Sequence, residues 1–462
     1  MFAVILDGAT DPCQSGTVRL RSTGFRSLLL ALIPLGALPV RAAEAGPVYD
    51  VRDYGAKGDG LTVDTRAIQA AIDACGAAPG TVRLHDGVFL SGMIVLKSGV
   101  ALRIEPSATL LGTRDDAAYP YLSPPTDNSN LHNCRRALVY ALGANHLSIS
   151  GGGTIDGNGG NPKWKGKGNP EANRPMPIFL VQSADVEIHD IQVLNAAMWS
   201  VVNMENDRVS IRKVRVHSPD GPTRDGIDIL DCHHVTIEDC EIFSQDDSIC
   251  FKSGSDKGVF DVKVHNVQIQ KSSVANGLKL GTASKGSFRH ILFDTVVMND
   301  IKQAAMAVES VDGAKVEDIE FRNIEFHQAG AAFYVVLGPR GKSKSIGSVH
   351  NLTFSNIRGE TALPWGSAIS GVQLEGGIYP IDQITFEHVH LKVLGGITKA
   401  PPPSPPEYDG GYPDPRIWNL LPAFGYYFRH VHGLRMTDCT SELTAPDGRP
   451  EIVREDVTES KP

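Results

Sequence analysis

A short pattern of apolar residues recurs along most of the chain, and it limits the folds that this sequence can adopt. Apolar residues occupy positions 1, 3, 6 and 8 of each copy, as in VSIRKVRV and VTIEDCEI. The copies begin at Val186, Val209, Val235, Val262, Ile291 and Ile319, and looser copies begin at Leu352, Ile384 and Leu434. Successive starts are 23, 26, 27, 29, 28, 33 and 32 residues apart, and the last interval is 50 residues. Such a period is typical of a solenoid.

The spacing within each copy identifies the repeating unit as a β-strand. Apolar and polar residues alternate with a period of two and slip once in the middle of the copy, which predicts a strand with a bend. A second short strand follows most copies, in the segments GIDIL, SICFK, GLKLG, MAVES, FYVVL and VQLEG. The period leaves no room for a packed helix. It therefore predicts an all-β solenoid, a parallel β-helix with coils about 4.8 Å apart, and not a leucine-rich horseshoe, whose leucine and asparagine signature is missing.

Two segments outside the repeat are expected to be a cap and a loop. Residues 64–75 (DTRAIQAAIDAC) have helical apolar spacing, so we expect a short N-terminal helix that shields the first coil. The Pro-rich insertion near residues 400–412 contains APPPSPPEYDGG and has too few backbone donors to join the sheet.

The beginning of the chain has the features of a secretory leader. Arg26 precedes the apolar stretch Ser27–Val40, and the small-residue rule for signal cleavage is met at Val40-Arg41-Ala42. We expect residues 1–45 to be an N-terminal prefix and a signal peptide, with translation starting inside the prefix. A length of 462 residues suggests about three domains. Because a solenoid grows by adding coils, we expect instead a single domain over residues 46–462, secreted or periplasmic.

Net charge limits the classes of binding partner, and the cysteines indicate how the core and possible disulfides are built. Lys and Arg number 44 against 53 Asp and Glu, a net charge of −9 that disfavours nucleic acid or an anionic membrane as a partner. We expect a monomer. Six of the seven cysteines lie after the leader, in a compartment that permits disulfides, but Cys240 and Cys439 occupy apolar positions of the repeat and are expected to be small core residues. No metal-binding spacing is present in the sequence, so no metal or cofactor is predicted.

Alignment of the second short strands brings carboxylates together. The segments placed one above another are Asp225–Asp228, Asp247–Cys250, Asn276–Lys279 and Ala304–Ala307. In this register Asp225 and Asp247 are neighbours about 5 Å apart, and Asp246 adds a third carboxylate. Crowding raises the pKa of at least one of them, which places a general acid beside a general base, as glycoside hydrolysis requires. The alternative is that these residues serve only in turns or structural ladders.

The chain resembles glycoside hydrolase family 28, the polygalacturonase-like enzymes that degrade pectin. The resemblance lies in VRDYGAKGDG, GGGTIDGNGG, TRDGIDI and QDDSICFKSG. It implies a single-stranded right-handed parallel β-helix and a secreted, inverting hydrolase. Asp246 would be the general acid, and Asp225 and Asp247 the bases that activate water. In inverting glycosidases the acid and base carboxyl groups are usually about 6.5 to 9.5 Å apart, which is wider than the spacing of one coil. We keep the inverting mechanism that the resemblance implies, although the stacking distance is shorter.

Three motifs of the family are changed in this chain. Its Asn-Thr-Asp motif falls on Thr223-Arg224-Asp225 and keeps only the Asp. Its His-Gly motif falls on Asn276-Gly277, and its Arg-Ile-Lys motif, whose cations hold the uronate carboxylate, falls on Ala307–Glu309. Each lost charge-assisted pair is worth about 1.5 to 3 kcal/mol, so the usual grip on galacturonate is missing.

Five residues are therefore candidates for substrate binding: Asn276, Lys252, Lys279, Glu309 and Asp228. Lys279 or Lys252 could replace the missing cations. Alternatively, a neutral sugar occupies the subsite and Glu309 accepts hydrogen bonds from its hydroxyls. In a purely structural interpretation, the two lysines pair with Asp228 and nearby carboxylates.

Two other functions are compatible with these residues. One is a calcium-dependent polysaccharide lyase on the same fold, with Lys252 or Lys279 as the base. The other is a carbohydrate-binding β-helix that has lost catalysis. Aromatic residues near the insertion either stack on sugar rings or seal the C-terminal end of the solenoid: Tyr408, Tyr412, Trp418, Tyr426 and Tyr427.

Overall fold

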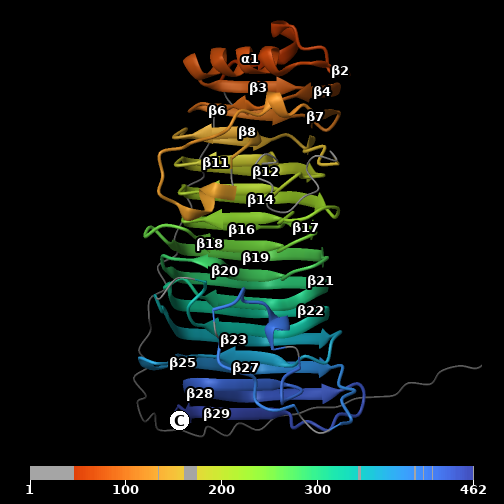
Figure 1. Cartoon of the computed structure of the whole chain (residues 1–462). Helices are drawn as coiled ribbons and strands as arrows, with labels where there is room; N and C mark the ends of the chain where they lie inside the picture. Colours follow the sequence, from red (N-terminus) through yellow and green to blue (C-terminus); the bar gives the residue numbers. More distant parts are fainter. Residues whose placement is uncertain are drawn as a thin grey trace, which may run out of the picture. The chain divides into compact units, whose positions relative to one another are not determined.

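The computed structural model describes residues 46–133, 135–160, 174–341, 345–399, 402–408, 410–418 and 420–460. The predicted leader over residues 1–45 lies outside the described residues. All but two of the described strands pair in parallel within one continuous sheet of 27 strands, and successive coils stack along the chain from the α1 end to β29 (Figure 1). The predicted parallel β-helix is confirmed.

The strands fall into four groups. Those of the N-terminal coils are β1 (Val48–Asp50), β2 (Asp59–Val63), β3 (Gly80–Leu84), β4 (Gly87–Ser91), β5 (Ile94–Val95), β6 (Val100–Ile104), β7 (Ala108–Gly112), β8 (Ala137–Leu142), β9 (Leu147–Ser150) and β10 (Thr154–Asp156). Those that hold the apolar repeat are β12 (Ala184–Leu194), β14 (Asp207–Ser218), β16 (His233–Glu238), β17 (Glu241–Ser244), β19 (Val259–Ser272), β21 (Phe288–Ser310), β22 (Lys315–Leu337), β23 (Ser348–Thr361), β27 (Ile381–Val393) and β28 (Tyr426–Leu443). The separate short strands are β11 (Met176–Val181), β13 (Val201–Met204), β15 (Ile227–Leu230), β18 (Ile249–Ser253), β20 (Leu278–Ser284) and β24 (Ser367–Ser370). The last strand is β29 (Ile452–Glu459).

Every predicted copy of the repeat stacks on the next in the predicted register. Val186 pairs with Val209, Val209 with Val235, and the pairing continues without a shift at this position to Ile384 and Leu434. The slip in the alternation is one residue in the left-handed conformation, such as Asp190 (φ 49°) or Asn266 (φ 51°). Asn and Asp tolerate this conformation better than most residues, so each copy bends at a fixed point.

One short strand was predicted at the wrong place. The segment VQLEG does not continue the stack, because Ala368 of β24 pairs with Tyr334 instead. Residues Val372–Leu374 form β25, which pairs antiparallel with β26 (Gly377–Tyr379). Gly377 begins β26 directly after the tight turn, at φ 124°, a conformation that only glycine adopts readily.

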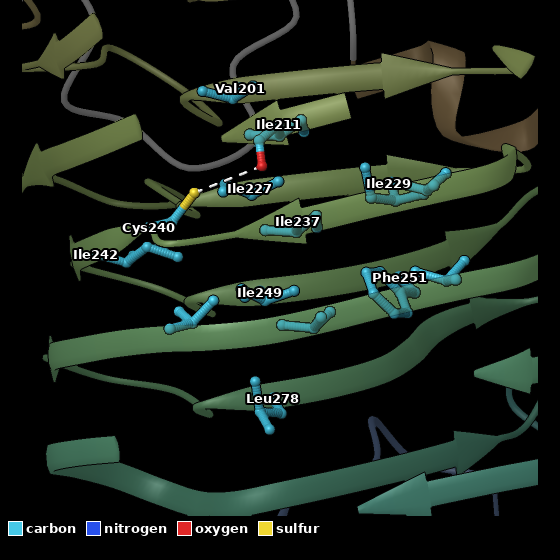
Figure 2. Packing of buried hydrophobic residues seen from close by; sticks show 14 of the residues in the cluster. Val201, Ile211, Ile227, Ile229, Ile237, Cys240, Ile242, Ile249, Phe251 and Leu278 are labelled. Atoms are coloured by element: carbon cyan, nitrogen blue, oxygen red, sulfur yellow. Dashed lines mark hydrogen bonds between the residues drawn. The ribbon is translucent and has the colours of Figure 1, made fainter. Parts of the chain in front are cut away.

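Stacked side chains fill the interior of the solenoid. Figure 2 shows Cys240 among the isoleucines of successive coils, with its thiol directed at the Ile211 carbonyl. A ladder of phenylalanines with ring centroids 4.8 to 5.3 Å apart joins five coils through Phe251, Phe293, Phe321, Phe354 and Phe386. Cys75, Cys232, Cys240, Cys250 and Cys439 are free thiols, and Cys240 is buried as predicted, whereas Cys439 is partly exposed.

The predicted cap is helix α1 (Thr65–Ala77), which covers the first coils with Ile68, Ala71, Ile72 and Cys75. It extends past Gly76, where the sequence suggested an end. Short 3-10 turns occur at η1 (Val51–Tyr54), η2 (Asp116–Ala118), η3 (Ser129–Asn133) and η6 (Pro415–Ile417). Among the described residues, no helix is long and apolar enough to cross a bilayer.

The Pro-rich insertion returns from the last coils toward the middle of the solenoid. Arg429 of β28 donates to the Pro406 carbonyl (3.1 Å), and Gly341 donates to the Gly410 carbonyl (2.8 Å). Farther along, Gln303 of β21 donates to Asp414 (2.9 Å). The insertion therefore spans several coils along one side of the sheet.

The five aromatic residues for which two roles were predicted differ in burial. Tyr408, Trp418, Tyr426 and Tyr427 are buried in the C-terminal part of the core, and the side chain of Tyr412 is 62% exposed. Only Tyr412 of this set is accessible enough to stack on a ligand.

Candidate active site

A cleft of about 670 Å³ lies over the second short strands and is bordered by the insertion. Its floor comes from the residues that precede or belong to β15, β18 and β20. The charged and aromatic side chains that line it are Arg174, Trp199, Asp225, Asp246, Asp247, Lys252, Lys279, Arg340, Tyr412, Asp414 and Arg416, together with the exposed His132.

The predicted register places Asp225 and Asp247 in adjacent coils. Ile227 pairs with Ile249, and the Gly226 amide donates to the Asp247 carbonyl at 2.9 Å. One carboxylate oxygen of each aspartate lies within 4.8 Å of the other. Gly226 is needed between them, because a Cβ there would lie 2.4 Å from the Ser248 carbonyl oxygen. In the Asp225-Gly226 pair, the glycine therefore allows the two coils to stack closely, and the aspartate places its carboxylate in the cleft.

Asp246 is half-buried at the edge of the cleft, beside these two carboxylates. Burial and the charges of Asp225 and Asp247 raise the pKa of Asp246 to about 7. The backbone here is held by Ser244 and Ser272, whose hydroxyls both donate to the Asp246 carbonyl at 2.8 Å. Asp246 therefore keeps a proton up to near neutral pH.

Asp247 is in the opposite protonation state. Burial works against its charge, but Lys279, Lys252 and hydrogen bonds from Asn276 hold the pKa of Asp247 below its ordinary value. The Asn276 side chain donates to Asp247 Oδ1 at 2.9 Å. The predicted site residue Asn276 thus lines the cleft and orients Asp247, at the position where the family pattern has histidine.

Lys252 forms ion pairs with two acidic residues, Asp225 in the turn before β15 and Asp228 in β15. Its ammonium is 2.9 Å from Asp225 Oδ2 and also contacts Asp228, while the Trp199 ring centroid lies 4.3 Å away. Burial raises the pKa of Asp225 well above its ordinary value and that of Asp228 to about 6, although the ammonium of Lys252 opposes both shifts. Asp228 is fully buried and does not line the cleft, so its position is that of a counter-ion and not of a substrate contact.

Lys279 lies between two carboxylates in the same way. Its ammonium is 3.2 Å from Asp247 Oδ2 and 3.4 Å from Glu309 Oε2. Glu309 also accepts a hydrogen bond from Thr282 at 2.7 Å, and its side chain is fully buried. The suggestion that Glu309 accepts hydrogen bonds from a bound sugar does not agree with this burial. The pairing of both lysines with carboxylates agrees with the structural interpretation of their role.

Several residues of the cleft have no signature in the sequence. Arg174 precedes β11 and is buried; its guanidinium contacts the Pro222 carbonyl, the Thr223 hydroxyl and Met198 Sδ at 3.4 Å. Burial lowers the pKa of Arg174 to about 10. Trp199, Arg340 and Arg416 were also missed as site residues, because they lie in turns and beside the insertion, outside the periodic strands, whereas Tyr412 was named as a possible sugar-stacking residue.

One wall of the cleft is anchored by a carboxylate that the sequence did not single out. Asp231 is fully buried and accepts hydrogen bonds from the Gly254 and Ser255 amides and from Asn128 (2.6 Å). Ser129 and Asn130, next to Asn128, line the cleft. Asp231 thus ties the segment around η3 to the turn after β18.

The residues at the centre of the cleft do not fit a calcium ion. Asp225, Asp247 and Cys250 have ligand atoms within 4.8 Å of one another, but a thiol is a poor ligand for calcium, which prefers six to eight oxygen atoms. The charges of the two aspartates are already offset by Lys252 and Lys279. Although burial opposes it, the neighbouring aspartates raise the pKa of Lys252 well above its ordinary value, and Asp247 and Glu309 do the same for Lys279. Neither lysine is therefore suited to act as the neutral base of a lyase.

Fold and site together define a class: a parallel β-helix with three clustered aspartates in a cleft on its side. Residues 79–399 match the model of glycosyl hydrolases family 28, and residues 48–109 match that of rhamnogalacturonase A/epimerase, pectate lyase-like proteins. The first match covers more than half of the chain, and the protein belongs to glycosyl hydrolases family 28.

Individual relatives agree with this assignment. A probable polygalacturonase of Vitis vinifera is 27% identical over 327 residues, which cover 66% of this chain and 65% of that protein. An exopolygalacturonase of Arabidopsis thaliana is 26% identical over 371 residues, covering 75% of this chain and 81% of that protein. The structure of the Yersinia enterocolitica family 28 exopolygalacturonase superposes with a TM-score of 0.70 at 18% identity, covering 90% of this chain and 79% of that one, and supports the fold.

Proposed function

We propose that the protein is a secreted, inverting glycoside hydrolase that cleaves a glycosidic bond in a pectin-type plant polysaccharide. Residues 1–45 would be the leader that directs secretion, and residues 46–462 the catalytic domain, acting as a monomer. The relatives named polygalacturonase support the substrate class. The catalytic cluster needs no metal or cofactor for this chemistry.

The opposite protonation states of Asp246 and Asp247 are the observation that supports the mechanism most directly. Asp246, with its pKa near 7, would donate its proton to the glycosidic oxygen as the bond breaks. Asp247, which is held ionised, would accept a proton from the attacking water, with Asp225 as its partner in the adjacent coil. The 4.8 Å limit applies to Asp225 and Asp247, neither of which is the proposed acid, so it is not the acid-to-base separation that distinguishes inversion from retention.

The decisive experiment measures reducing-end release from a panel of pectic fractions and neutral glycans, with Asp246→Asn as the matched variant. A positioned general acid contributes about 10² to 10⁴ in rate, so we expect Asp246→Asn to lose activity by that factor while its denaturation midpoint is retained. Proton NMR of the first product should show the anomeric configuration opposite to that of the substrate.

Three results would contradict the proposal. Retained turnover in Asp246→Asn would show that Asp246 is not the general acid. An unsaturated product whose formation is abolished by a chelator would indicate the lyase. Tight glycan binding without product release would indicate a binding protein.

A further inference from the structure

The cations on the Tyr412 side of the cleft are all paired with carboxylates. Lys279 lies 3.2 Å from Asp247 and 3.4 Å from Glu309. Arg340 Nε donates to Asp312 at 2.9 Å, and Arg416 Nε donates to Asp414 at 2.7 Å. Within the described part of the cleft, this side therefore offers a substrate no cation that lacks a carboxylate partner.

Glu309 is the residue that removes the positive charge next to Asp247. Its carboxylate is fully buried behind Lys279 and is held by the Thr282 hydroxyl at 2.7 Å. Burial raises the pKa of Glu309 to about 7, so above that pH one ammonium faces two ionised carboxylates. A uronate carboxylate placed here would lose its hydration without gaining a free cationic partner, which is unfavourable.

The same subsite offers groups that suit an uncharged sugar ring. Tyr412 is 62% exposed, and its hydroxyl is 3.1 Å from the Thr282 hydroxyl. Two residues after Tyr412, Asp414 accepts a hydrogen bond of 2.9 Å from Gln303, which holds this part of the chain against β21. The ring therefore has a fixed position, with an apolar face for the C–H face of a pyranose and hydroxyl groups beside it.

The opposite side of the cleft has a different charge. Arg174 lines it, and its hydrogen bonds with described residues go to neutral groups, the Pro222 carbonyl, the Thr223 hydroxyl and the Met198 sulfur, while the charges of the catalytic aspartates act on it without a direct ion pair. A uronate carboxylate can find a cation there. The cleft is thus electrostatically asymmetric about the catalytic aspartates.

We infer that the subsite bounded by Tyr412, Thr282 and Lys279 takes an uncharged pyranose unit, either a neutral sugar or a methyl-esterified uronate. The inference rests on the proposed hydrolase function and specifies the sugar class on one side of the cleaved bond. The shared chemistry is a ring without a free carboxylate.

The test uses oligogalacturonides with random partial methyl esterification and, in a second arm, oligomers in which galacturonate alternates with rhamnose. Mass spectrometry of the products identifies the units at the two new chain ends. We expect a methyl ester, or rhamnose in the second arm, to be enriched about tenfold at one new end and not at the other. Cleavage of the esterified oligomers alone would identify the uncharged ring as a methyl-esterified uronate, and cleavage of the rhamnose-containing oligomers alone would identify it as a neutral sugar.

Glu309→Gln keeps the shape of the side chain and, at pH 8, above the Glu309 pKa of about 7, removes one negative charge from behind Lys279. We expect it to reduce the enrichment about tenfold, while Tyr412→Phe leaves the enrichment unchanged and Tyr412→Ala lowers kcat/KM on all substrates. If Glu309→Gln does not fold, the product analysis of the wild-type enzyme decides the inference by itself.

Free uronate at both new ends, in proportion to its abundance or above it, would overturn the inference although hydrolysis occurs. No cleavage of any oligomer would instead contradict the proposed function.

Discussion

The replacement of Lys252 by methionine tests whether the carboxylate cluster depends on its buried cations. The ammonium of Lys252 is shared by Asp225 (2.9 Å) and Asp228, and the three side chains are 9%, 4% and 0% exposed. Methionine keeps most of the volume of the stem and removes the charge. The variant therefore leaves two buried carboxylates without a cation.

The expected loss is large because the whole group is buried. Breaking a buried pair by removing one partner costs about 3 to 5 kcal/mol, against about 0 to 1 kcal/mol for an exposed pair. The loss should also depend on pH. Burial already raises the pKa of Asp228 to about 6, and without Lys252 it rises further, so the folded variant holds protons that the unfolded chain releases at about pH 4. Stability of the variant therefore falls as pH rises above about 4, and the deficit is small at acid pH and full at pH 8.

The assay is urea denaturation followed by circular dichroism at pH 4.5 and pH 8. Lys271→Met is the matched control, because Lys271 pairs with Asp300 at a site where the two side chains are 37% and 58% exposed. The double variant Lys252→Met with Asp228→Asn should recover part of the loss at pH 8, since one uncompensated carboxylate is removed. A deficit below about 1 kcal/mol, or one that is equal at both pH values, would refute the reasoning.

Two further predictions concern catalysis and the core. Because Asp246 must be protonated to act as the acid and its pKa is about 7, kcat/KM on a pectic substrate should fall about tenfold per pH unit above pH 7. A profile that is flat to pH 9 would exclude this role. Phe321 stacks between Phe293 (4.8 Å) and Phe354 (5.1 Å), so Phe321→Ala should cost about 3 to 5 kcal/mol in unfolding free energy. A loss under about 1 kcal/mol in denaturant would mean that the ring ladder contributes little.

Periodic features of the chain are predictable because they are determined locally. The spacing of Val186, Val209 and Val235 sets the register of successive coils, and the structure repeats it pair by pair. The same register places Asp225 over Asp247. The exception, VQLEG, occurs where Gly377 allows a hairpin to leave the stack, a local alternative that the period does not reveal.

The electrostatic character of the site is not predictable in this way. The sequence left open whether Lys252 and Lys279 hold a substrate or pair with carboxylates, because the direction of a long side chain depends on all its neighbours at once. Only the tertiary structure placed Glu309 behind Lys279 and excluded it from the cleft. The same is true of Arg174, which lies outside the repeat.

By itself, then, the sequence determined the solenoid, its coil register and the alignment of three aspartates, since each follows from the alternation of residues along a strand. The tertiary structure decided which cations are free to meet a substrate and which sugar-facing groups border the cleft. Tyr412 reaches the site because Gln303 binds Asp414 across 111 positions of sequence. Contacts of that range depend on how loops pack over the coils, and no periodic pattern specifies them.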